Sequence, residues 1–229
     1  MRSNIDLLED AAAKLGRLLE EVVFLGGCVV ELLITDTGAA PVRGTIDVDV
    51  VANIATYADY IVFSDRLRLL GFSEDQAEGA PVCRWKHGDL RLDVMPVDED
   101  ALGFSNLWYP GALETAEPTT LPSGTAIRLI TASYFLGTKM EAFRGRGGRD
   151  FFSSHDLEDC IAVVDGRESV TKEVAGAAEE LRDYLRNEVE ALLRQPSFLD
   201  ALPGYLMGDS ISQRRVAVVL ERLSMIAAM

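Results

Sequence analysis

The chain has 229 residues, 48% hydrophobic and 26% charged, which predicts a globular protein with one large domain or two small ones. Its 37 acidic and 22 basic residues give a net charge of −15, which argues against a broad, nonspecific grip on nucleic acid. The three cysteines are far apart and there are only two histidines, which favours neither a disulfide framework nor a zinc site. The sequence shows no pattern of a leader or a membrane segment, so we expect a cytoplasmic protein.

The chain begins with helical patterns separated by a glycine pair. Apolar residues at steps of three and four predict an amphipathic helix from Ile5 to Val22. After Gly26 and Gly27, a dense apolar pattern from Cys28 to Ile34 predicts a second, buried helix. Such a glycine pair leaves backbone N–H groups open to a phosphate, although two adjacent glycines more often form only a turn.

Two carboxylates interrupt the next apolar run, Thr45 to Val50, which otherwise reads as a buried strand. Side chains alternate along a strand, so Asp47 and Asp49 share one face. Neighbouring carboxylates repel each other unless a cation lies between them, and this spacing therefore favours a divalent-cation site. The alternative is an exposed edge strand whose charges discourage aggregation.

A helix and a hairpin follow the acidic strand. Residues Ala55 to Leu70 read as a helix that ends at Gly71. Two short strands, Val82 to Lys86 and Leu90 to Val94, are separated by a Gly-Asp turn. Asp93 is a third carboxylate on a strand, and a hairpin paired next to the acidic strand would bring it onto the same face as the acidic pair.

A lysine lies on the inward side of a later helix. Lys139 lies three residues after Leu136 and four before Phe143, on the same side of the helix as these apolar residues. A lysine in this position either extends to solvent or binds an anion, and we favour an anion, phosphate or carboxylate, with Asp150 as the expected protein partner. Asp150 and Asp156 also fit the start of the next helix, where acids are favourable.

Basic and aromatic residues come close together after this helix. Arg144, Arg146 and Arg149 precede Phe151 and Phe152. The cluster is either a solvated loop or a surface that contacts phosphate, and the sequence favours neither interpretation over the other.

The rest of the chain reads as helical. Apolar residues from Val170 to Leu192 repeat at helical spacing, Pro196 interrupts the pattern, and residues Val216 to Leu223 resume it. Such stripes are more often core than partner-binding surface.

The glycine pair, the two acids at i and i+2 and the third acid on a later strand together resemble the nucleotidyltransferase superfamily, the fold of the DNA polymerase beta type. A second block, from Thr138 to Phe143 and on through Asp150 to Asp159, resembles the AbiEii-like abortive-infection toxins of type IV toxin-antitoxin systems. The resemblance covers roughly residues 20 to 165.

The resemblance implies an α+β fold in which a small mixed sheet flanked by helices, residues 1–127, precedes a helical C-terminal domain, residues 128–229. It implies that Asp47, Asp49 and Asp93 bind magnesium, as two ions, and that Asp93 takes the proton from the attacking hydroxyl. The residues expected to contact the nucleotide are Gly26, Gly27, Arg43, Lys139 and Asp150.

The implied function is a magnesium-dependent nucleotidyltransferase that moves a nucleoside monophosphate from a nucleoside triphosphate to a hydroxyl. The expected acceptor is an RNA 3′ end such as that of tRNA, in a toxin that an antitoxin protein restrains. Two alternatives stay open. The acidic charge favours a small-molecule acceptor of the antibiotic type, and a catalytically silent protein that binds a nucleotide or a partner would tolerate Asp47→Ala.

Overall fold

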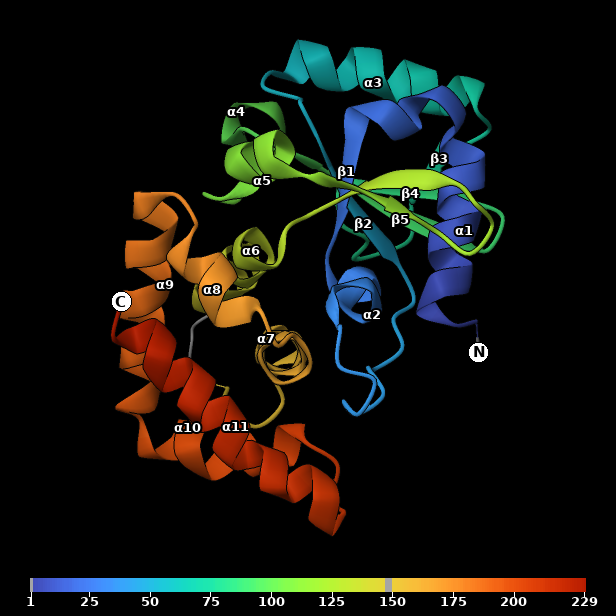
Figure 1. Ribbon diagram of the computed structural model, residues 1–229. Helices are drawn as coiled ribbons and strands as arrows, with labels where there is room; N and C mark the ends of the chain where they lie inside the picture. The colour runs from blue at the N-terminus through green and yellow to red at the C-terminus, as the bar shows by residue number, and fades with distance from the viewer. Residues whose placement is uncertain (1, 147–149) are drawn as a thin grey trace. The chain divides into compact units, whose positions relative to one another are not determined.

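The protein is described from a computed structural model that covers residues 2–146 and 150–229 (Figure 1). The chain divides into two compact units. The first comprises Met1–Val29 and Arg43–Thr131, and the second comprises Val30–Val42 and Ala132–Met229. The expected division between residues 127 and 128 stays a prediction.

A mixed sheet forms the centre of the first unit. Within the described residues it has seven strands in the order β3-β4-β5-β2-β1-β7-β6. β2 pairs with β5 and β1 with β7 in parallel, whereas the other neighbours are antiparallel. The strands are β1 (Val22–Leu25), β2 (Val48–Ala52), β3 (Ser73–Glu74), β4 (Arg84–His87), β5 (Leu90–Pro96), β6 (Glu117–Thr120) and β7 (Ala126–Leu129).

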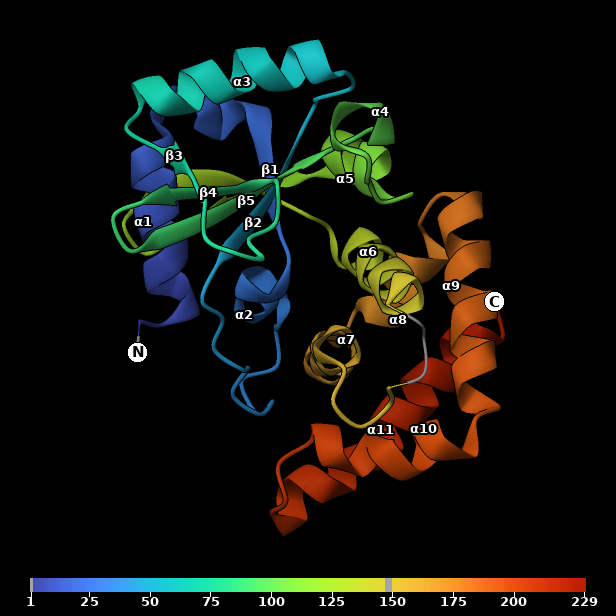
Figure 2. The same ribbon diagram turned by 180° about the vertical axis from the view of Figure 1, so that it is seen from behind.

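Helices lie alongside this sheet, as Figure 2 shows for α1 and α3. α1 contacts β2 and β5. Both helices begin with a capping box, formed by Ser3 and Asp6 in α1 and by Thr56 and Asp59 in α3. The helical elements of the unit are α1 (Asn4–Leu15), η1 (Gly16–Glu21), η2 (Gly27–Val29), α3 (Tyr57–Leu69), α4 (Glu99–Leu102) and α5 (Tyr109–Thr115).

The prediction of one helix from Ile5 to Val22 is wrong beyond Leu15. Gly16 has a φ of +51°, and the chain continues as a 3-10 helix and then as β1. β1 is buried along its whole length between β2 and β7. A strand that is buried on both faces is apolar at every position and shows no alternation. Val22, at the start of β1, therefore also fitted the helical spacing of the apolar residues before it.

The acidic strand begins later than predicted. β2 starts at Val48, so Asp47 lies just before it, and Ile46 is 56% exposed rather than buried with Val48 and Val50. The second predicted helix, Cys28 to Ile34, is also shorter, because η2 occupies its first turn and α2 covers only Val30–Leu33.

The other predictions for this unit are largely confirmed. α3 matches the predicted helix and ends before Gly71, whose φ is +87°. β4 and β5 form the predicted hairpin. The sequence did not predict α4, α5, β6 or β7, which are short and carry polar residues or proline.

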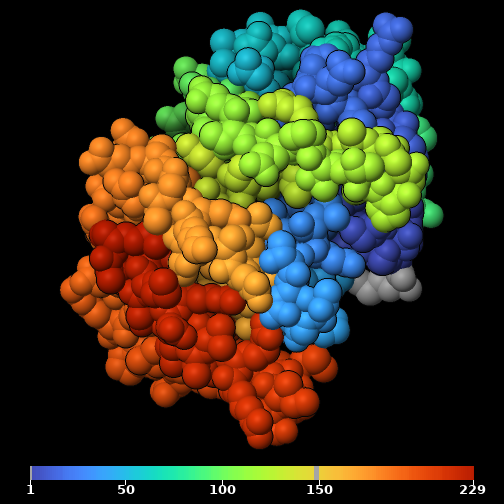
Figure 3. All heavy atoms as spheres, in the orientation of Figure 1, coloured from blue at the N-terminus to red at the C-terminus, as the bar shows by residue number. Residues whose placement is uncertain are grey.

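The second unit is helical. α11 contacts α9, α7 and α8, and Figure 3 shows it in red on the surface. The helical elements are α2 (Val30–Leu33), α6 (Ala132–Gly145), α7 (His155–Gly166), α8 (Val170–Ala175), α9 (Glu179–Leu193), α10 (Pro196–Ala201), η3 (Leu202–Tyr205) and α11 (Ser210–Ala227). None of the described helices is long and apolar enough to cross a membrane.

The long helix predicted from Val170 to Leu192 is two helices, α8 and α9, separated by residues 176–178. Val174 and Leu181 are buried on either side of this break. They are seven residues apart, about two helical turns, so the apolar period stays in phase across the break and conceals it.

Residues of the early segment Val30–Val42 are held inside the second unit. The backbone N–H groups of Thr35 and Asp36 each donate to the carbonyl of Gly166 at 2.9 Å. Arg215 of α11 forms ion pairs with Asp36, at 2.7 Å, and with Asp165, at 2.8 Å. An early segment of the chain and its last helix thus meet in this unit.

Candidate active site

The pairing of β2 with β5 brings strand-borne carboxylates together in the first unit. Asp49 and Asp93 are directly opposite each other in the parallel register. Side chains of paired residues lie on the same face of a sheet, and Asp47 precedes Asp49 by two positions. The expected placement of the hairpin next to the acidic strand is therefore confirmed.

The carboxylates bind a residue that the sequence analysis did not identify. Arg84, the first residue of β4, is the antiparallel partner of Asp93. Its Nε donates to Asp93 Oδ1 at 2.7 Å and its Nη2 to Asp93 Oδ2 at 2.7 Å, a bidentate arrangement. The same Nη2 donates to Asp47 Oδ2 at 2.6 Å. The hydrogen bonds with Asp93 and the charges of the carboxylates raise the pKa of Arg84 above its already high value.

In this arrangement the carboxylates do not fit a magnesium site. Both oxygens of Asp93 and one oxygen of Asp47 accept hydrogen bonds from Arg84. Across residues 2–146 and 150–229, no three His, Cys, Asp or Glu side chains are grouped so that they could hold a metal ion. The positive charge that the sequence analysis expected between the acids is supplied by a guanidinium.

Gly26 gives Asp49 the space that it occupies. The glycine has a φ of +76°, and a Cβ built on it would lie 1.8 Å from Asp49 Oδ2. Gly27 is buried and begins η2. The glycine pair therefore brings bare backbone against one of the predicted catalytic carboxylates, and its expected contact with a phosphate stays a prediction.

A buried asparagine fixes the segment that leads into the acidic strand. Asn4, which is 3% exposed, donates to the carbonyl of Arg43 at 3.0 Å and accepts from the backbone N–H of Thr45 at 2.9 Å. Thr45 in turn donates to the carbonyl of Asp47 at 3.2 Å. Asn4 is thus a positioning residue that no sequence motif indicated.

Lys139 and Asp150 lie in the second unit. Lys139 binds carboxylates there, with its Nζ 2.6 Å from Asp159 Oδ2 and 3.3 Å from Asp156 Oδ1. The prediction of an anionic partner is confirmed, but the expected pairing with Asp150 is wrong. Asp150 accepts hydrogen bonds from Ser153 in its own turn, while Asp156 lies in the first turn of α7, as its sequence position suggested.

Carboxylates also neutralise part of the basic cluster. Arg144 Nη1 lies 3.2 Å from Glu188 Oε1, and Arg146 forms an ion pair with Asp156. Arg149 is outside the described residues. Phe152 is 70% exposed. The described arginines therefore offer a phosphate less free charge than their number in the sequence suggests.

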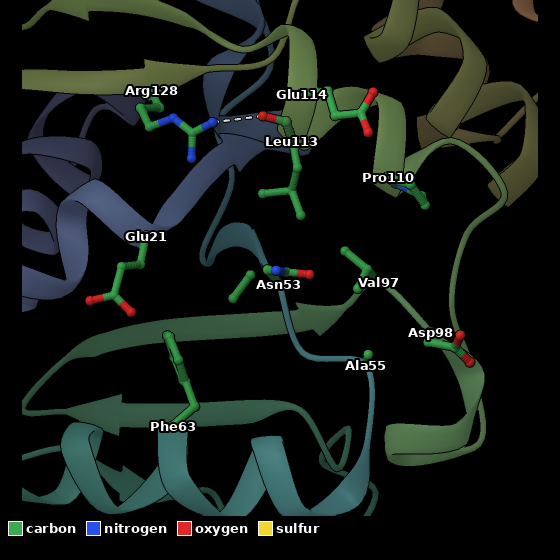
Figure 4. Close-up of a pocket in the computed structure, with 11 residues that line it drawn as sticks. Glu21, Asn53, Ala55, Phe63, Val97, Asp98, Pro110, Leu113, Glu114 and Arg128 are labelled. Carbon is green, nitrogen blue, oxygen red and sulfur yellow. Dashed lines mark hydrogen bonds between the residues drawn. The ribbon is translucent and has the colours of Figure 1, made fainter.

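A cavity of about 640 Å³ opens at the other end of the central strands (Figure 4). Asn53 and Val97, which follow β2 and β5, help to line it. Arg128 lies at its edge and donates to the carbonyl of Leu113 at 2.6 Å. The cavity begins about 10 Å along the strand from Asp49, so it is separate from the carboxylates.

All three cysteines are buried, and none of them forms a disulfide within the described residues. Burial, with the nearby charge of Asp93, raises the pKa of Cys83 to about 12, and burial raises the pKa of Cys160 well above its usual value.

At pH 8 the Cys83 thiol is then almost entirely protonated, and we expect the native protein to react with a disulfide reagent far more slowly than a free cysteine does. The Cys83 rate should rise with pH toward about 12. Unfolding in guanidinium is the control and should release all three thiols, whereas fast reaction of the native protein at pH 8 would contradict the prediction.

The mixed sheet and its helices have the nucleotidyltransferase fold. The chain is similar to the crystal structure of an antigenic nucleotidyltransferase-like protein from Paracoccidioides brasiliensis, with a TM-score of 0.50 and 22% identity over 87% of this chain and 93% of that chain. The structure of JHP933 from Helicobacter pylori aligns with a TM-score of 0.48 and 12% identity over 97% of this chain and 90% of that chain. No family model matches the sequence, and no curated protein matches it.

Proposed function

We propose that this protein is a nucleotidyltransferase that transfers a nucleoside monophosphate from a nucleoside triphosphate to a hydroxyl group, with pyrophosphate as the leaving group. One observation carries the proposal: in a nucleotidyltransferase fold, Asp49 and Asp93 are in register on adjacent parallel strands, and Asp47 shares Arg84 with Asp93. The packing of Asp49 against the bare backbone of Gly26 supports the same assignment.

Each carboxylate has a role in this proposal. Transfer at phosphorus requires a group that accepts the hydroxyl proton and opposite charge near the phosphates. We assign the proton to Asp93, which can accept it only after Arg84 releases its oxygens. After the same release, Asp47 and Asp49 would be available to hold magnesium together with Asp93, and magnesium would supply the charge that stabilises the attacking and leaving oxygens.

We further propose an RNA 3′ end, such as that of tRNA, as the acceptor, and a cytoplasmic toxin that an antitoxin protein restrains. This part of the proposal rests on the resemblance of residues 138–159 to AbiEii-like toxins. Arg144 and Arg146 form ion pairs with carboxylates, so their charges contribute little to binding the phosphates of an RNA. The net charge of −15 favours a small-molecule acceptor instead.

The proposal predicts that Asp47→Ala reduces nucleotidyl transfer at least about 100-fold, because the site loses one of its three carboxylates. The measurement uses each of four α-labelled nucleoside triphosphates with magnesium and follows the label onto total RNA and, separately, onto small hydroxyl-bearing acceptors. Chelation of the metal with EDTA should abolish the same transfer.

Asp89→Ala is the matched control, because Asp89 is an exposed acid in the turn between β4 and β5. It should transfer label at the wild-type rate. Label on RNA would identify the acceptor class and the nucleotide, whereas label only on a small molecule would reject the RNA acceptor. Transfer that is unaffected by Asp47→Ala would refute the assigned site.

A catalytically silent nucleotide-binding protein is the second candidate. The observation that favours it is Arg84, which occupies oxygens that a catalytic metal needs. This candidate predicts that wild type binds a nucleoside triphosphate in calorimetry but transfers no label to any acceptor.

A further inference from the structure

Arg84 is bound as a cation inside the carboxylate cluster. Its three hydrogen bonds to Asp47 and Asp93 have lengths of 2.6–2.7 Å. The side chains are largely shielded from water, with exposed fractions of 16% for Arg84 and 6% for Asp93. Charge pairs in such surroundings are stronger than surface pairs, because water screens them less.

The cluster cannot hold Arg84 and a divalent cation in the same way at once. Each carboxylate oxygen keeps a second lone pair, but Nη2 of Arg84 donates to both Asp47 and Asp93 and so occupies the space between the two carboxylates that a bridging metal would need. A divalent ion next to Arg84 would also meet a like charge. Arginine does not lose its proton in proteins, so the conflict is resolved only when the side chain moves away.

The position of Arg84 in the sheet is compatible with such a movement. It is the first residue of β4, directly after the turn at Val82 and Cys83. The neighbouring strand β3 is only two residues long, and its register partners are Trp85 and Lys86 rather than Arg84. On that side the carbonyl of Arg84 accepts from the backbone N–H of Asp75 at 3.0 Å, so the movement concerns the side chain of Arg84 and not its backbone.

We propose that Arg84 and a divalent cation compete for the carboxylates of Asp47 and Asp93, so that Arg84 closes the site until it is displaced. This inference rests on the proposed function, since it adds a regulatory contact to the same carboxylates. It also explains how three acids can remain close together in the absence of metal: the guanidinium offsets the repulsion that the sequence analysis identified.

The test measures binding of Mn²⁺ alone to the intact protein, without nucleotide, by calorimetry and by the paramagnetic signal of free Mn²⁺. Arg84→Gln should bind Mn²⁺ at least about tenfold more tightly than wild type, and Mn²⁺ should raise its melting temperature more than that of wild type. Arg84→Lys keeps the charge but cannot form the bidentate contact, so an intermediate affinity is expected.

Arg91→Gln is the matched control. Arg91 carries the same charge two residues before Asp93 on β5, but its register partner on β4 is Lys86 rather than an acid. Its loss tests the effect of net charge alone and should leave Mn²⁺ affinity within about twofold of wild type. Circular dichroism of each variant verifies that it is folded, and Arg84→Lys continues the test if Arg84→Gln does not fold.

Equal tightening in Arg84→Gln and Arg91→Gln would overturn the inference, because net charge would then explain it. Mn²⁺ affinity that is unchanged or weaker in Arg84→Gln, or binding in no variant at millimolar Mn²⁺, would overturn it as well. The label-transfer assay is separate from these measurements. Transfer by wild type without competition at Arg84 would reject only the inference, whereas Mn²⁺ competition without transfer by wild type or Arg84→Gln would reject only the proposed function.

Discussion

Replacing Gly26 by alanine is expected to reduce nucleotidyl transfer at least about 100-fold and to lower the free energy of unfolding by about 1–3 kcal/mol. The loss of stability comes from the φ of +76°, which an L-residue adopts only with strain, and from the clash of the new methyl group with Asp49. The loss of activity comes from Asp49, because its carboxylate occupies the volume that the new methyl group would fill. Urea denaturation and the label-transfer assay measure the two effects.

Gly124→Ala separates the two causes. Gly124 has a φ of +88° but has no atom within 4 Å of a built Cβ, so its replacement introduces strain without a clash. It should lower stability by less than Gly26→Ala does, because only the strain is introduced, and it should leave transfer intact. The double variant Gly26→Ala with Asp49→Ala removes the clashing carboxylate but keeps the Cβ of residue 49, which lies 2.7 Å from the built Cβ, so stability should recover only in part relative to Gly26→Ala. A Gly26→Ala enzyme with wild-type transfer would show that the position of Asp49 does not matter.

Replacing Lys139 by methionine is expected to lower the free energy of unfolding by about 3–5 kcal/mol, because it leaves buried carboxylates without their ammonium partner. Asp156 and Asp159 have side-chain exposures of only 7% and 3%, and both lie within ion-pair distance of Lys139. Methionine retains most of the apolar volume, so the loss reports mainly on charge. Urea denaturation followed by circular dichroism provides the measurement.

Lys172→Met is the control, since Lys172 is exposed on α8. It should change stability by less than about 0.5 kcal/mol. Adding Asp159→Asn to Lys139→Met should restore part of the loss, because one uncompensated charge is removed. If Lys139→Met is as mild as Lys172→Met, the buried ion pairs contribute little to folding.

Local chemistry made some elements of the fold predictable. The apolar stripe of α1 and the glycine that follows α3 are local features, and the sequence located both helices, although α1 ends at Leu15 rather than Val22. β1 is different, because its Val-Val-Phe-Leu run is apolar through burial on both faces, a consequence of pairing with distant strands. The break between α8 and α9 was hidden because it preserves the helical period.

Of the two carboxylates that bind Arg84, only Asp93 could be predicted as its partner from the sequence. A two-residue turn after His87 fixes the hairpin register, which places Arg84 directly opposite Asp93. The predicted hairpin therefore already implied that Arg84 and Asp93 are register partners. The bond to Asp47 was not accessible in the same way, because it depends on the parallel pairing of β2 and β5, two strands about 40 residues apart along the chain.

The membership of residues 30–42 in the second unit has a consequence for synthesis of the protein. This segment leaves the ribosome early, but Gly166 and Arg215, the partners of Thr35 and Asp36, are made at least 130 residues later. Domains generally fold as units during synthesis, and contacts between distant segments are slow to form. The nascent chain must therefore hold apolar residues such as Val30 and Leu33 unpaired while most of the protein is translated, and a shortened chain that ends near Thr131 would leave them without their helical neighbours.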